Sequence, residues 1–145
     1  MTVGEHPVER GSRLVPHTAD CILEAWGPDR ASCLEEAVGG LVGVFAGTSD
    51  AAATTVLPVS LEPAPDPDIL VALLEEVIYT AEVFGKVPVR VHLTETEEGG
   101  IAGDMEVVDG TQVPLIGPVP KAVSYHGLEF TGTAGDWRCH VVVDV

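Results

Sequence analysis

The chain has 145 residues, with 7 Lys and Arg against 23 Asp and Glu, so its formal net charge is −16. This length fits a single domain, and a hydrophobic content of 46% excludes a disordered acidic tail. Because so acidic a chain repels phosphate, we expect no direct binding of nucleic acid or of an anionic membrane. The longest apolar or small run, 37–47, is too short to span a bilayer, and no secretory signal is visible.

The cysteine count bears on the cellular compartment. Cys21, Cys33 and Cys139 are odd in number and lie far apart, which fits a reduced cytoplasm better than a disulfide framework. We therefore expect a cytoplasmic protein in which Cys21 and Cys139 are small core side chains among strand residues.

The N-terminal region divides into a leader and the beginning of a domain. Residues 1–12 are polar and show no hydrophobic period, so we expect a flexible leader followed by one domain at 13–145. Residues 14–16 and 21–26 predict two strands, which flank the polar residues 17–20.

Apolar residues at helical spacing then predict an amphipathic helix over 30–46. Two N-caps fit its start: Asp29, or Ser32 with Glu35 in a capping box. Three glycines between 39 and 43 each cost about 1 kcal/mol against alanine inside a helix, which indicates close packing on a sheet.

The middle of the chain predicts a strand and a second helix. Residues 54–62 are rich in β-branched side chains, which favour a strand. After a proline-rich connector, Asp66 as cap and Pro67 at the first helical position open a helix that ends at Gly85.

The C-terminal half alternates with period two and predicts four strands in two hairpins, at 87–94, 101–108, 122–130 and 137–144. Three prolines and two glycines predict a loop at 109–120. This order of elements predicts a single α+β domain with two helices packed on a largely antiparallel or mixed β-sheet.

One acidic residue lies in an unusual place. Asp144 follows a strongly β-forming run and stands beside the α-carboxylate of Val145. If the last strand lies beside the beginning of the domain, Asp20 adds a third source of oxygen ligands. A cation relieves such a cluster, and calcium and magnesium prefer these oxygens. Spacing alone favours a solvated strand end over a metal site.

Histidines offer weaker signals. His17 and His126 fit metal ligands, a catalytic base or partly buried, hydrogen-bonded side chains, and neither lies in an HxxxH or HxxE arrangement. The sequence also lacks a GxSxG nucleophile motif. We therefore predict no catalytic residues and a protein that is not an enzyme.

Several segments together resemble the archease family. They cover nearly the whole domain, and the specific part of the match is the order of an HTAD segment, a KAVSYHGLE segment and a closing Asp-Val. The matching positions are 14–20, 25–27, 34–37, 121–129, Trp137 and 141–145.

The resemblance implies a protein that assists an RtcB-type RNA ligase, which joins RNA ends in tRNA splicing or RNA repair with GTP and manganese. Archeases promote guanylylation and repeated turnover of that ligase and have been regarded as chaperone-like. Family members hold a metal ion, often calcium, at positions that correspond here to Asp20, Asp144 and Val145.

Four further residues of the matching segments are predicted functional neighbours of this site: His17, Lys121, Tyr125 and His126. The chain departs from the family at 111–120, where the His-Pro and acidic loop typical of members is replaced by a segment with no His and no acid. The resemblance therefore leaves open how this loop acts on a partner.

Two alternatives belong to other functional classes. A metal-dependent hydrolase would use Asp20, Asp144 and His126, and would need an open coordination position with a base near the bound water. A protein-interaction module without metal would use none of these ligands.

Overall fold

The computed structural model describes residues 8–17, 20–47 and 55–145. Within these described ranges, two helices and seven strands follow the predicted order. The elements are β1 (Gly11–His17), β2 (Asp20–Gly27), α1 (Arg30–Val42), β3 (Thr55–Leu61), α2 (Asp66–Phe84), β4 (Lys86–Glu95), β5 (Ile101–Asp109), the 3-10 turn η2 (Gly110–Gln112), β6 (Ala122–Thr133) and β7 (Asp136–Asp144). The predicted α+β class is confirmed.

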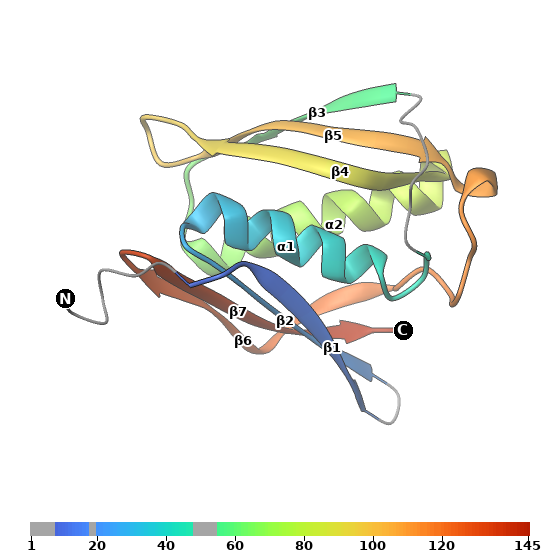
Figure 1. Cartoon of the computed structure of the whole chain (residues 1–145), viewed down its shortest axis with the longest axis horizontal. Helices are drawn as coiled ribbons and strands as arrows, with labels where there is room; N and C mark the ends of the chain where they lie inside the picture. The colour runs from blue at the N-terminus through green and yellow to red at the C-terminus, as the bar shows by residue number, and fades with distance from the viewer. Residues whose placement is uncertain (1–7, 18–19, 48–54) are drawn as a thin grey trace.

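The strands form two sheets, with the helices between them (Figure 1). One sheet has the order β1-β2-β7-β6 and the other the order β3-β5-β4, and all these neighbours pair antiparallel. The sequence analysis placed all the strands in one sheet, and the structure corrects this by dividing them between two. Alternation reports which face of a strand is apolar and not which strand is its neighbour, so it could not reveal the division.

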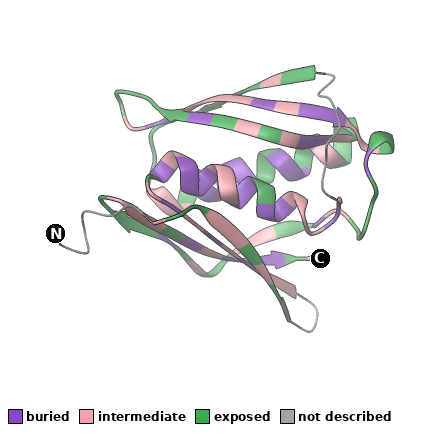
Figure 2. Cartoon of the chain, viewed as in Figure 1, coloured by how far each residue is buried: buried purple, intermediate pink, exposed green. Residues whose placement is uncertain are grey.

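The main core fills the space between the sheets, and Figure 2 shows buried residues concentrated there. Leu23 of β2, Leu34 of α1, Leu73 of α2 and Val141 of β7 are fully buried. Burying a side chain of this size contributes about 1.5–3 kcal/mol. Among the described residues, no helix is long and apolar enough to cross a membrane.

The observed helix ends agree with some of the predicted caps and stop signals and differ from others. Asp29 is the N-cap of α1: its carboxylate accepts the Ser32 N–H at 2.7 Å, and its own N–H donates to Ser32 Oγ at 3.2 Å. Asp66, predicted as the cap of α2, is instead its first residue. Gly85 ends α2 as predicted, with a positive φ of 63° that favours glycine. The first helix stops at Val42, earlier than expected, because residues 43–45 form a turn.

Close packing on the sheet explains one glycine of α1 but not another. A Cβ on Gly40 would lie 2.4 Å from Leu23 Cδ1, so close packing on the sheet is confirmed there. A Cβ on Gly39 would meet nothing within 4 Å, so packing does not explain that glycine and the prediction is wrong for it. Of the predicted core cysteines, Cys139 is buried, whereas Cys21 is only half-buried.

Arg30 joins three elements at one end of the domain. Its Nη1 lies 2.7 Å from Asp66 Oδ1 at the start of α2, and its Nε lies 2.8 Å from Glu95 Oε1 at the end of β4. Its Nη2 donates to the Gly99 carbonyl at 2.7 Å. With only 8% of the residue exposed, Arg30 is the one charged residue among the buried residues of the described chain.

Candidate functional site

Two acidic side chains face each other where β2 begins and β7 ends. Asp20 and Asp144 are direct partners in the antiparallel register, so their side chains project from the same face of the sheet. Their neighbours Leu23, Val141 and Val143 point into the core, which leaves the two carboxylates on the outer face. Asp20 is half-buried and Asp144 is exposed.

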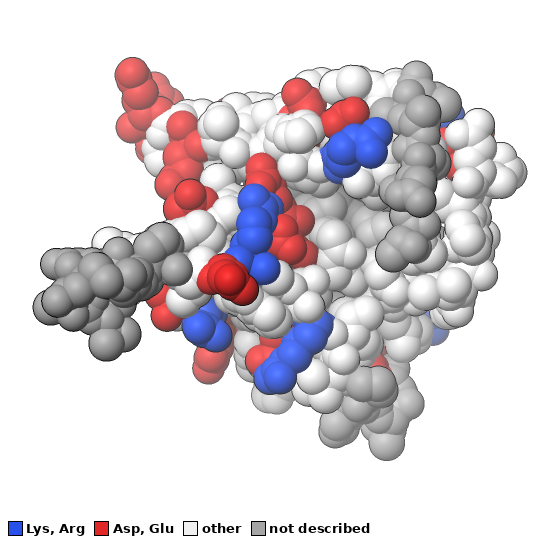
Figure 3. Space-filling model, in the orientation of Figure 1, with Lys and Arg blue, Asp and Glu red and all other residues white. Residues whose placement is uncertain are grey.

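This pair has no basic partner in the described part of the chain. Six of the 7 Lys and Arg residues form ion pairs there, and none of those pairs includes Asp20 or Asp144. Figure 3 shows one face of the molecule, on which the basic side chains lie beside acidic ones. Like charges directly opposite each other on adjacent strands are destabilising. Carboxylates arranged in this way fit a hard divalent cation, which would offset their repulsion.

The neighbouring backbone fixes the position of the pair. Ala122 of the edge strand β6 is the other register partner of Asp144, and the Lys121 N–H donates to the Asp144 carbonyl at 2.8 Å. Val145 is half-buried and its side chain packs against the core. The backbone next to Asp144 is therefore held on both sides and cannot swing freely away from Asp20.

The predicted neighbours divide into two groups. His17 is the register partner of Asp20 across β1 and β2, so its backbone lies beside the pair. Tyr125 is directed elsewhere, because its hydroxyl donates to Asp68 Oδ1 of α2 at 2.8 Å; this bond raises the pKa of Tyr125. His126 is exposed, and its N–H donates to Ser124 Oγ at 3.0 Å.

The site that the alternative hydrolase function would need does not assemble among the described residues. No group of three or more His, Cys, Asp or Glu side chains that could hold a metal lies among the residues described, so His126 does not complete a set with Asp20 and Asp144. A side-chain site of the kind required for a metal-bound nucleophile and a base is therefore missing from the described structure. The acidic pair remains, with backbone oxygens as its available additional donors.

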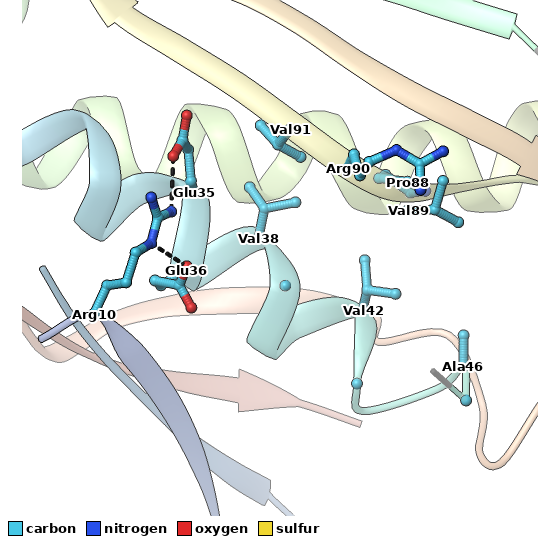
Figure 4. Close-up of a pocket in the computed structure, with 13 residues that line it drawn as sticks. Arg10, Glu35, Glu36, Val38, Val42, Ala46, Pro88, Val89, Arg90 and Val91 are labelled. Carbon is cyan, nitrogen blue, oxygen red and sulfur yellow. Dashed lines mark hydrogen bonds and ion pairs between the residues drawn. The ribbon is translucent and has the colours of Figure 1, made fainter. Parts of the chain in front are cut away.

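A separate groove of about 280 Å³ lies between α1 and the edge strand β4 (Figure 4). Its floor is apolar, with Val38 and Val42 from the helix and Val89 and Val91 from the strand. Gly39 leaves the helix backbone open toward it. Among the described residues that line the groove there is no His or Cys, so they offer neither a thiol nor an imidazole base.

One end of the groove is closed by an ionic cluster that the sequence did not reveal. Arg10 pairs with Glu35 at 2.7 Å and with Glu36 at 2.6 Å, and Glu35 also accepts the Leu93 N–H of β4 at 2.7 Å. Arg10 lies within the predicted leader 1–12, yet it is anchored on α1, and β1 begins at Gly11. These contacts join residues far apart in the chain, so no local pattern could have signalled them.

Comparison with known proteins identifies relatives along the whole domain. The sequence model of the Archease protein family (MTH1598/TM1083) matches residues 13–145. "Probable protein archease" of Mycobacterium tuberculosis (strain ATCC 25618 / H37Rv) is 39% identical over 145 residues, which cover 100% of this chain and 80% of that protein. "Protein archease" of Methanosarcina barkeri is 31% identical over 135 residues, with 89% and 92% covered.

Two solved structures share the fold. Protein 1598 of Methanobacterium thermoautotrophicum matches with a TM-score of 0.73 at 22% identity, and 93% of this chain and 99% of that chain are covered. A Thermotoga maritima protein described as an archease and possible chaperone matches with a TM-score of 0.63 at 20% identity, with 92% and 96% covered.

Proposed function

Because the chain belongs to the archease protein family, we propose that it acts as a metal-binding, chaperone-like activator of an RtcB-type RNA ligase, promoting ligase guanylylation and turnover in tRNA splicing or RNA repair. The observation that carries this proposal is the pair of opposed carboxylates, Asp20 and Asp144, which has no basic partner among the described residues. The description of one structural relative as a possible chaperone agrees with a role exerted on another protein.

The chain's own contribution is to present acidic groups at a rigid strand end. Asp20 and Asp144, with backbone oxygens of Val145, would hold one divalent ion, for which calcium is the leading candidate. The bound ion supplies positive charge at an otherwise negative edge. Adjacent strand pairing keeps the two carboxylates opposed before any ion arrives, so little side-chain order has to be imposed on binding.

The net charge of −16 favours a basic protein partner over RNA itself. Complementary potentials steer an acidic protein toward a ligase whose surface handles RNA. The acidic pair would then lie against the nucleotide site of the ligase and bias it toward the geometry that reacts with GTP. Two residues would flank this contact. His17 is the register partner of Asp20, and the backbone N–H of Lys121 donates to the Asp144 carbonyl.

The test is covalent guanylylation of the cognate ligase, followed over time with labelled GTP in the presence and absence of this protein. We expect the native chain to accelerate it, and Asp20→Asn and Asp144→Asn each to lose most of that acceleration. The matched control is Asp104→Asn, which removes an acid from the outer face of the other sheet. Equal acceleration by all four proteins would reject the role of the pair, and no acceleration by the native chain would reject the activator function.

A further inference from the structure

The outer side of α2 is a helix face left uncovered in the described structure. Tyr79 projects from it with 52% exposure, and Tyr125 of the adjacent edge strand β6 is 58% exposed. Together they line a shallow cavity of about 410 Å³. Half of the large exposed hydrophobic side chains in the described chain lie here or at the end of α2, with Val83 and Phe84 as the others.

Four carboxylates surround these two rings. Asp68, Glu75, Glu76 and Glu82 all project from α2 beside them, and none takes part in an ion pair of the described residues. We call Asp68, Glu75, Glu76, Tyr79, Glu82 and Tyr125 the α2–β6 face. Aromatic residues are enriched at the centre of protein–protein interfaces, and a polar, solvent-accessible rim surrounds them.

The α2–β6 face is continuous with the strand end that carries the acidic pair. Lys121 and Ala122 line an adjoining cavity of about 240 Å³ with Glu75, Tyr79 and Glu82. The Lys121 N–H in turn donates to the Asp144 carbonyl. A partner that covers the α2–β6 face therefore also lies next to Asp144.

We propose that the α2–β6 face is a docking surface for a protein segment rich in arginine and lysine. The occupant follows from charge complementarity. Four carboxylates here oppose one ammonium group, that of Lys121, because the other basic side chains of the described chain are engaged in ion pairs elsewhere. Exposed tyrosine rings add a preference for arginine, whose guanidinium stacks on aromatic faces and pairs with carboxylates. This inference rests on the face itself and needs neither a bound metal nor the ligase.

The experiment titrates the isotope-labelled protein with a synthetic amphipathic helical peptide that carries arginines along one side and leucines beside them. A peptide with glutamines in place of the arginines is the control ligand. We expect saturable binding with backbone amide shifts concentrated in α2 and in residues 121–125. Tyr79→Ala, a change at a half-exposed ring, should weaken the affinity about tenfold.

The charge-matched variants separate a docking surface from general attraction. Glu75→Gln with Glu82→Gln removes two charges from the α2–β6 face, whereas Glu97→Gln with Glu98→Gln removes two from the exposed turn between β4 and β5. Only the first pair should weaken binding. Equal losses, or shifts spread over all acidic regions, or no saturable binding would overturn the proposal. The Asp20→Asn protein should bind the peptide normally, so failure here and failure of ligase activation are distinguishable.

Discussion

Arg30 offers the sharpest test of what holds the helices to the β3-β5-β4 sheet. A cation at the first residue of a helix is unfavourable to the helix dipole, so its presence there points to its partners. Those partners are Asp66, Glu95 and the Gly99 carbonyl, which belong to two other elements and a turn. Replacing Arg30 by alanine removes all three hydrogen bonds at once.

The expected loss of unfolding free energy depends on how deeply Arg30 and its carboxylate partners are buried. Removing one partner of a fully buried ion pair costs about 3–5 kcal/mol, because the other charge is left without compensation. Here the carboxylates of Asp66 and Glu95 stay 35% and 47% exposed, so water can solvate them after the change. We therefore expect Arg30→Ala to lower the free energy of unfolding by about 2–3 kcal/mol. This corresponds to a fall in Tm of roughly 5–10 °C for a domain of this size.

The assay is urea denaturation followed by tryptophan fluorescence, with Arg13→Ala as the matched control. Arg13 makes one ion pair, with Glu24, and its side chain is 65% exposed, so its loss should cost no more than about 0.5 kcal/mol. Arg30→Lys keeps the charge but lacks the planar guanidinium that reaches three acceptors. Its loss of unfolding free energy should therefore lie between those of Arg30→Ala and Arg13→Ala. Equal stability of Arg30→Ala and Arg13→Ala would refute the assignment of Arg30 as a junction.

Three further predictions concern the helix, the acidic pair and pH. Gly40→Ala should destabilise the protein by about 1–3 kcal/mol, since its Cβ would lie 2.4 Å from a leucine methyl. Gly39→Ala should stabilise it by up to about 1 kcal/mol, because its Cβ would meet nothing within 4 Å and alanine favours a helix. Thermal melts of the two variants test both predictions. Without divalent ions Asp144→Asn should stabilise the fold by about 0.2–1 kcal/mol by relieving repulsion from Asp20, while calorimetric titration should show weaker calcium binding. Hydrogen bonds from His92 and Arg90 of β4 lower the pKa of Glu106 below the ordinary value of a glutamate. Its stabilising contribution is therefore present above that ordinary value and is lost as pH falls through the lowered folded pKa; an NMR titration of the Glu106 side chain tests this.

The sequence by itself determined the elements and their order, because the signals for them are local. Helical periodicity, strand alternation and the stop at Gly85 each act over a few residues, and all are realised in the structure. The archease resemblance likewise came from contiguous segments, and the family match over 13–145 confirms it. The weakest local predictions were element ends, such as the end of α1 and the cap of α2, where neighbouring residues compete for the same role.

Only the tertiary structure decided which distant residues meet. It divided the strands between two sheets, set Asp20 opposite Asp144 in register, and directed Tyr125 to Asp68 and away from that pair. It also buried Arg30 among acceptors from three segments. These arrangements depend on strand order and helix placement, which are selected by the packing of the whole core, so no pattern within one segment specifies them.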